Sequence, residues 1–317
     1  MLKRTAKWMA AALLASAPAL LGQGVQRPQL LGVEHLSLFV HDFDKAHAFY
    51  QDFLGFDEAY SLKNADGSTA ISFFKINDRQ YIQISKEKEA NSDRLNHYGL
   101  QTEDAEALRA YLGSKGVAVP EHVKKARIGV ITFTFKDPEG HSIEVVQYTP
   151  DSWPTRETGK HMPETRASKH MMHVGIIVTQ FDAEMKFYQD VLGFKEIWRG
   201  SSTGTTLSWV NLKLPDSEDY IELMLAKTAA PPDKRGTSHH LCLEVPNIDA
   251  SVAALNEKPY RKEYTRPIEI RTGKNRKRQA NLFDPDGTRT ELMEPHTVDG
   301  KPAPPSDAPP PGAETTK

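Results

Sequence analysis

The side chains in this sequence that could do chemistry are histidines and carboxylates within short apolar stretches. His35 and Glu144 lie in such stretches in the first half of the chain. His173 and Glu291 lie in similar stretches in the second half. Imidazole combined with carboxylate suits zinc, iron, nickel, cobalt or manganese. A set of thiolate ligands is not available, because Cys242 is the only cysteine. These residue types therefore favour a divalent metal held by nitrogen and oxygen.

The spacing of these residues along predicted strands places them on one side of a sheet. Successive side chains of a strand point to opposite faces. In residues 33–40, Leu36 and Leu38 point to one face, which a helix should cover, and His35 points to the other. The same separation from the apolar row holds for the other ligand-type residues, which are Gln83, His97, Glu144, His173, Glu222, His240 and Glu291.

Two motifs each occur twice in the chain. Phe-Tyr-Gln-Asp-Phe-Leu-Gly-Phe at residues 49–56 returns as Phe-Tyr-Gln-Asp-Val-Leu-Gly-Phe at 187–194. Asp-Pro-Glu-Gly at 137–140 returns as Asp-Pro-Asp-Gly at 284–287, and a glutamate follows each copy. Copies this far apart indicate duplicated domains rather than a solenoid of short repeats.

Hydrophobic periodicity predicts the same succession of elements four times. Each unit has a strand, a helix and then roughly three strands, with the Asp-Pro-x-Gly steps as tight turns. The predicted opening strands are 33–40, 96–101, 173–178 and 240–245, and the predicted helices are 44–54, 105–112, 182–192 and 248–255. Later strands are predicted at 70–75, 80–85, 130–135, 141–147, 205–212, 220–225, 280–283 and 288–293.

This plan resembles the vicinal oxygen chelate superfamily, which includes glyoxalase I, methylmalonyl-CoA epimerase, fosfomycin and bleomycin resistance proteins, and extradiol dioxygenases. The resemblance rests on the two repeated motifs and covers about residues 31–296. It implies an α+β fold in which four βαβββ units pair into two open-cup, mixed-sheet domains. We expect the first glyoxalase-like domain at 31–148, a linker at 149–169 and the second glyoxalase-like domain at 170–296.

The resemblance also implies a divalent metal, which could be Zn, Fe, Ni, Co or Mn, on the concave face of each cup. Glu222 looks like the fourth ligand of the glyoxalase I set, and Gln83 looks more like a member of the epimerase set. Carried over position by position, the implied ligands of the N-terminal cup are His35, Gln83, His97 and Glu144. Those of the C-terminal cup are His173, Glu222, His240 and Glu291.

The number of ligands bears on the reaction that the resemblance implies. Four protein ligands leave two positions of an octahedron open, which suits a metal that grips adjacent substrate oxygens and acidifies a neighbouring C–H. The implied reaction is a glyoxalase-like isomerisation, epimerisation or lyase step on a small oxygenated metabolite, in which metal-bound oxygens stabilise an enediolate. Glu291 or Glu222 would then double as the catalytic base.

Two other functions remain open. His173, His240 and Glu291 alone leave three positions free, which suits an Fe(II)-dependent dioxygenase. Extradiol dioxygenases place a tyrosine three residues before the aspartate of Asp-Pro and a histidine several residues earlier. Here Asn281 and Thr134 occupy the tyrosine positions, and neither copy has the histidine. Alternatively, the chain sequesters a ligand between its cups, as resistance proteins of the family do.

Basic residues crowd the segment before the last predicted strands. They either steer an anionic substrate toward the C-terminal cup or belong to a solvated hairpin. They are Arg261, Lys262, Arg266, Arg271, Lys274, Arg276, Lys277 and Arg278.

The first 24 residues predict a secretory signal peptide. Three basic residues within the first seven precede an apolar run at 8–21, which is too short for a comfortable membrane span. Cleavage between about Ala17 and Gly24 would export the protein, to the periplasm or the outside, without a stable membrane anchor.

The C-terminal end and the net charge give two further expectations. Residues 297–317 are rich in proline and are predicted to be a disordered tail. The net charge of −2 gives no electrostatic case for nucleic acid. We expect a small-molecule substrate as the partner, and the sequence does not indicate an oligomeric state.

Overall fold

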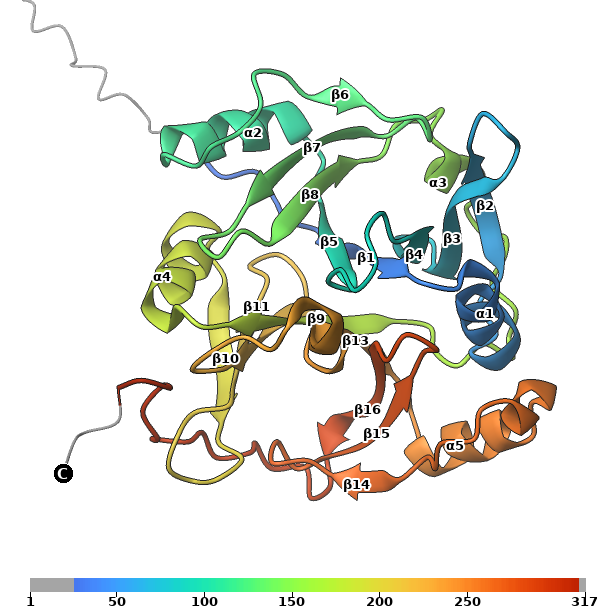
Figure 1. Ribbon diagram of the computed structural model, residues 1–317. Helices are drawn as coiled ribbons and strands as arrows, with labels where there is room; N and C mark the ends of the chain where they lie inside the picture. The colour runs from blue at the N-terminus through green and yellow to red at the C-terminus, as the bar shows by residue number, and fades with distance from the viewer. Residues whose placement is uncertain (1–25, 314–317) are drawn as a thin grey trace, which may run out of the picture.

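The computed structural model describes residues 26–313, which fold into two eight-stranded mixed sheets (Figure 1). The α+β fold of four units that the sequence predicts is confirmed. The predicted signal peptide, residues 1–24, lies outside the described residues. Within the described range, no helix combines the length and the apolar character needed to cross a bilayer.

The first half of the chain builds one sheet, whose concave face we call the N-terminal cup. Its strand order is β2-β3-β4-β1-β5-β8-β7-β6. β1 is antiparallel to β5, so the first two units join edge to edge there. The elements are β1 Gly32–Val40, α1 Phe43–Ala48, η1 Phe49–Phe53, β2 Glu58–Lys63, β3 Thr69–Asn77, β4 Gln80–Lys86, β5 Leu95–Gln101, α2 Ala105–Ser114, β6 Lys124–Lys125, β7 Ile131–Lys136 and β8 Ser142–Gln147.

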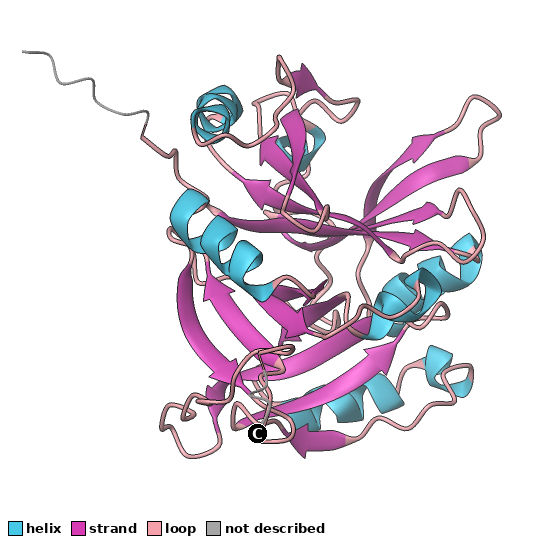
Figure 2. Ribbon diagram, turned by 60° about the vertical axis from the view of Figure 1, so that its left-hand side comes forward, coloured by secondary structure: helices cyan, strands magenta, loops and turns pink. Residues whose placement is uncertain are grey.

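The second half repeats this plan, and the concave face of its sheet is the C-terminal cup. The strand order β10-β11-β12-β9-β13-β16-β15-β14 matches the first sheet position by position. Figure 2 shows its strands curving into an open layer. The elements are α3 Trp153–Arg156 in the linker, β9 Met171–Val178, α4 Phe181–Lys186, η2 Phe187–Val191, β10 Lys195–Gly200, β11 Trp209–Lys213, β12 Tyr220–Leu225, η3 Pro232–Thr237, β13 His240–Glu244, α5 Ile248–Asn256, η4 Pro259–Lys262, β14 Ile270–Thr272, β15 Lys277–Phe283 and β16 Arg289–Thr297.

The predicted helices at 44–54 and 182–192 each differ from the prediction in their second half. Both start as α-helices and then widen into a π-helical turn, η1 or η2. Phe49, Tyr50 and Phe53 of η1 all lie in the core, where none is more than 1% exposed. Gly55 then ends the turn with a left-handed φ of 78°.

The periodicity missed the strands at the sheet edges. β2, β6, β10 and β14 are short or only half-buried, so their sequences lack a clear apolar alternation. The described part of the predicted tail makes backbone hydrogen bonds to the second half of the chain. The Ser306 N–H donates to the Arg199 carbonyl, and Pro309 accepts from Leu207. These bonds hold part of the tail against the second sheet, next to its edge strand β10.

The two repeated motifs bind each other across the two halves. The Tyr50 hydroxyl donates to Asp284 Oδ2 at 3.1 Å, and the Tyr188 hydroxyl donates to Asp137 Oδ2 at 3.3 Å. Each tyrosine of a Phe-Tyr motif therefore contacts the Asp-Pro-x-Gly turn of the other half. Burial raises the pKa of both tyrosines well above its usual value, which keeps them protonated as donors. The duplication of both motifs thus has a structural reason.

A half-buried ion cluster joins the halves at a second place. His170 Nε2 lies 2.7 Å from Asp219 Oδ1, and His170 Nδ1 lies 3.0 Å from Glu244 Oε2. The other Asp219 oxygen accepts from the Val33 N–H of the first half at 2.8 Å. The hydrogen bond to Asp219 is the main reason why the pKa of His170 is raised from 6.5 to about 9.

This cluster predicts a pH-dependent stability. Because the folded pKa of His170 is above its unfolded value, its stabilisation is complete below about pH 6.5 and is lost as pH rises through about 9. His170→Gln should therefore lower the thermal midpoint at pH 6, and the difference from wild type should shrink by pH 10. Thermal denaturation across this range measures it. The control is His122→Gln, since His122 is exposed and makes no contact across the halves. A difference that grows with pH would contradict the role given to His170.

Candidate metal centres

In the C-terminal cup, four neighbouring strands each contribute one ligand-type side chain. His173 comes from β9, Glu222 from β12, His240 from β13 and Glu291 from β16. All four are buried, and one ligand atom of each lies within 4.8 Å of those of the others. The structure thus brings together the four side chains that the sequence analysis placed in this cup.

The distances within this group fit a single ion. His173 Nε2 and His240 Nε2 are 3.1 Å apart. The Glu222 carboxylate lies 3.4 Å from His240 Nε2, and the Glu291 carboxylate lies 3.5 Å from His173 Nε2. Bonds of about 2.0–2.2 Å to nitrogen and oxygen place neighbouring ligand atoms on the order of 3 Å apart. The donor set and its spacing therefore fit a divalent metal.

Hydrogen bonds from outside the group orient two of its side chains, His240 and Glu291. His240 Nδ1 lies 2.7 Å from the Ser238 carbonyl, which can only accept, so Nδ1 carries the proton, and the Nε2 lone pair can accept from Arg289 at 2.8 Å. Gln279 Nε2 donates to Glu291 Oε1 at 2.7 Å and leaves Oε2 facing the histidines. Sequence reasoning missed Gln279, although it lies on the strand next to β16 and pairs with Met293.

Burial sets the protonation of the C-terminal group. It lowers the pKa of His173 and of His240 well below 6.5, so both imidazoles are neutral at neutral pH, as metal ligands must be. Burial also raises the pKa of Glu291 to about 7, a rise that the nearby Arg289 opposes. A bound cation would compensate the two carboxylates that the protein holds here.

A glycine makes room for His240. Gly175 on β9 pairs with His240 on β13, and a Cβ atom at Gly175 would overlap with the imidazole ring. In the N-terminal cup, Gly99 on β5 lies under the ring of His35 in the same way. The backbone is therefore shaped to accept one histidine ring of each cup.

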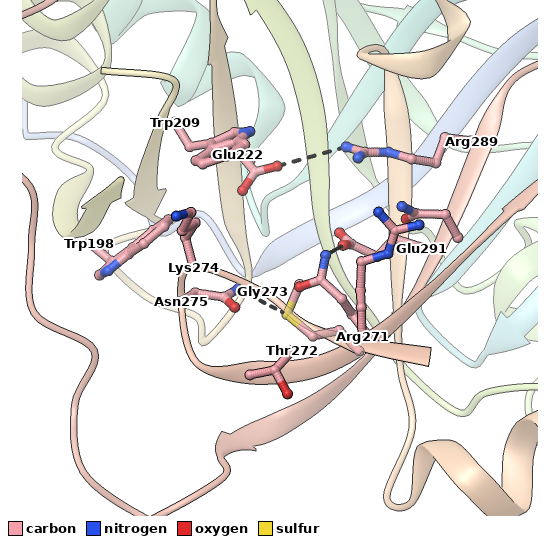
Figure 3. Close-up of a pocket in the computed structure, with 13 residues that line it drawn as sticks. Trp198, Trp209, Glu222, Arg271, Thr272, Gly273, Lys274, Asn275, Arg289 and Glu291 are labelled. Atoms are coloured by element: carbon pink, nitrogen blue, oxygen red, sulfur yellow. Dashed lines mark hydrogen bonds and ion pairs between the residues drawn. The ribbon is translucent and has the colours of Figure 1, made fainter. Parts of the chain in front are cut away.

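Glu222 and Glu291 of the C-terminal group line a cavity of about 350 Å³ (Figure 3). Trp198 and Trp209 lie on one side of it, with ring centroids 6.5 Å apart. Arg289 reaches into it and lies 4.0 Å from Glu222. Sequence reasoning missed these three, although Arg289 stands two residues before Glu291 and shares its face. Of the basic segment, Arg271 and Lys274 line the cavity.

The N-terminal cup holds a smaller group of the same type. His97 Nε2 lies 3.1 Å and His35 Nε2 lies 3.5 Å from the Glu144 carboxylate. Neither Nε2 atom has a hydrogen-bond partner in the described part of the chain. Gln83 lines the same cavity, which has a volume of about 220 Å³. The four side chains predicted for this cup therefore also meet, with three ligand atoms in close contact.

Glu34, which the sequence analysis missed, orients His35. Its carboxylate accepts from His35 Nδ1 and leaves Nε2 free to face the cup, and it also accepts from the Tyr148 hydroxyl at 2.6 Å. Burial alone would lower the pKa of His35, but Glu34 reverses this and raises it. Strand parity puts neighbours on opposite faces. A β-bulge between Val33 and His35 breaks this alternation at Glu34, so strand parity did not predict the contact between Glu34 and His35.

Comparison with known proteins gives a family and a fold. The model of the Glyoxalase/Bleomycin resistance protein/Dioxygenase superfamily matches residues 32–145 and 170–292. A search among curated proteins gave no match. The Mn(II)-bound glyoxalase from Novosphingobium aromaticivorans has a TM-score of 0.65 and 19% identity, with 90% of each chain covered.

Ring-cleaving dioxygenases are similar to the same extent. An extradiol ring-cleaving dioxygenase from B. fuscum has a TM-score of 0.65 and 17% identity, covering 90% of this chain and 77% of the other. The 2,3-dioxygenase LapB from Pseudomonas sp. KL28 has a TM-score of 0.61 and 16% identity, covering 87% and 97%. At these identities, the likeness extends to the fold alone.

The C-terminal group predicts a specific loss of metal. His240→Ala should lower metal affinity there at least about tenfold, since removing a ligand should cost no less than removing its orienting partner. Metal content after gel filtration measures this. His296→Ala on the exposed end of β16 is the control. Unchanged metal content in a His173→Ala, His240→Ala protein would place the metal elsewhere.

Proposed function

This chain belongs to the Glyoxalase/Bleomycin resistance protein/Dioxygenase superfamily, and we propose that it is a metal-dependent enzyme acting on a small oxygenated metabolite in its C-terminal cup. The observation that carries the proposal is the convergence of two neutral imidazoles and two carboxylates, with the two carboxylates lining an open cavity. Zn, Fe, Ni, Co or Mn would suit these donors.

We propose an isomerase, epimerase or lyase reaction of the glyoxalase type. A divalent cation held by these residues would polarise adjacent oxygens of the substrate and make a neighbouring C–H more acidic. Glu291 is the base that we assign to this C–H. Gln279 holds its carboxylate in one orientation, with the other oxygen facing the histidines.

Glu222 decides between this reaction and oxygen chemistry. As a fourth ligand it would leave two positions, enough for a chelating substrate but too few for that substrate together with O₂. Its carboxylate lies 3.4 Å from His240 Nε2 and 3.8 Å from His173 Nε2, which supports this role.

The second candidate function is an Fe(II)-dependent dioxygenase that uses His173, His240 and Glu291. Its support is the fold similarity to extradiol dioxygenases over 90% of this chain. The cavity has Asn281 and Lys274 near the positions where the extradiol signature requires tyrosine and histidine. A substrate for this reaction would need another group to exchange protons with it.

Substitution of Glu222 separates the two reactions. In a four-ligand enzyme, Glu222→Ala should weaken metal binding about tenfold or more. The wild type should then convert α-hydroxycarbonyl or hemithioacetal-like compounds without oxygen. Assays of such a panel with and without O₂ measure this, with Glu218→Ala as the control because Glu218 is exposed beside β12.

The opposite results are equally clear. Nearly intact Fe(II) binding in Glu222→Ala, together with oxygen uptake stoichiometric with product, would make the protein a dioxygenase. Inactivity on the whole panel would favour a third function, a protein that sequesters its ligand.

We also propose that the protein is exported, on the basis of the basic start and apolar run of residues 1–24. The mature form should begin between about Ala17 and Gly24. N-terminal sequencing of protein from the cell exterior or periplasm checks this. A mature protein that retains Met1 in the cytosol would rule out export.

A further inference from the structure

The two cups have the same strand order, but the side chains that line their cavities differ. We propose that the N-terminal cup is a second binding site, which takes a small uncharged molecule with an apolar body and oxygen atoms at one end. This goes beyond the function proposed for the C-terminal cup, because it gives the duplicated half a different ligand.

The polar end of this site contains two histidine nitrogens that have no hydrogen-bond partner among the described residues. His35 is 1% exposed, and its Nε2 atom has no hydrogen-bond partner among the described residues. The same holds for His97 Nε2, which lies beside the Glu144 carboxylate. The Glu34 contact holds a proton of His35 on Nδ1, and Nε2 is the ring atom that lies beside Glu144. A metal ion and the oxygens of a ligand fit this end.

The rest of the cavity is apolar. Its walls come from Tyr60, Leu62, Ile71, Phe73, Ala126, Ile128, Val130 and Val146. Among the described lining residues, Arg127 is the one Lys or Arg, and its guanidinium donates to the Lys63 carbonyl at 3.0 Å. With a volume of about 220 Å³, the cavity has room for one small molecule of this kind.

Positions that correspond in strand register show how the cups diverged. Phe73 pairs with Gln83 in the first sheet, and Asn211 pairs with Glu222 in the second. A buried phenyl ring therefore stands where the other cup has an amide whose Oδ1 has no hydrogen-bond partner within residues 26–313. Ser142 stands two residues before Glu144, where Arg289 precedes Glu291. At both positions the N-terminal cup has the less polar or uncharged residue.

The charges in the two cups call for different ligands. In the N-terminal cup, the carboxylates of Glu34 and Glu144 would balance a divalent cation. An anionic ligand there would meet one cationic side chain, Arg127, which is exposed, so its charge is screened by solvent. In the C-terminal cup two carboxylates would again balance the cation, but three further cationic side chains line the cavity, and these favour an anion. They are Arg271, Lys274 and Arg289 (Figure 3).

Two probes that differ by one carboxylate test the proposal. Benzohydroxamic acid has an apolar ring and two adjacent oxygens, and 4-carboxybenzohydroxamic acid adds one negative charge. Calorimetric titration uses full-length, metal-loaded protein. A His173→Ala, His240→Ala variant keeps only the N-terminal ligand set, and a His35→Ala, His97→Ala variant keeps only the C-terminal set.

We expect the protein with only the N-terminal set to bind benzohydroxamic acid at least about tenfold more tightly than the carboxylated probe. The protein with only the C-terminal set should show the reverse order. Adding Arg271→Gln and Lys274→Gln to the latter should remove its preference, since both side chains line the open cavity. Adding Ala126→Lys to the former should shrink its preference several-fold, because it places a cation in the N-terminal wall.

Three results would overturn the proposal. These are equal affinities in the protein with only the N-terminal set, a preference there for the carboxylated probe, and no binding of either probe, which would leave a structural metal only. Turnover in the protein with only the C-terminal set reports separately on the function proposed for that cup. Failure of one proposal is thus distinguishable from failure of the other.

Discussion

The constraint on which the rest of this structure depends is the burial of carboxylates and neutral imidazoles around one point in each cup. In the C-terminal cup, His173 and His240 lie 3.1 Å apart with pKa values lowered by burial, next to two carboxylates. Such a group is unfavourable in a water-poor interior unless a cation joins it. The proton on His240 Nδ1, the amide of Gln279 and the absence of a side chain at Gly175 all serve this arrangement.

The cups keep their relation because the duplicated motifs bind across the halves. The bonds from Tyr50 to Asp284 and from Tyr188 to Asp137 are equivalent under the duplication, and each joins a helix end of one half to a turn of the other. The Asp-Pro-x-Gly turn leads directly into β8 or β16, the strand that carries the glutamate of that cup. The motif contact therefore positions a metal-ligand candidate as well as the interface.

Much of the fold and the central part of both sites could be predicted from sequence, since strand parity is a local property. It placed His35 and Glu291 on the open face without knowledge of the other strands. Parity failed at Glu34, because a bulge depends on how β1 pairs with β5. It also missed Trp198, which lies on a half-buried edge strand and folds over Gly200. Features set by pairing between distant segments leave no local signal.

The central claim is that the C-terminal cup holds one divalent metal through side chains of four strands. Anomalous diffraction from crystals of the metal-loaded protein, recorded on both sides of the absorption edge, tests it most directly. The account predicts one peak within bonding distance, about 2.0–2.3 Å, of His173 Nε2, His240 Nε2 and the carboxylates of Glu222 and Glu291. A fully loaded crystal without a peak at this point, or with the metal bound only elsewhere on the protein, would contradict it.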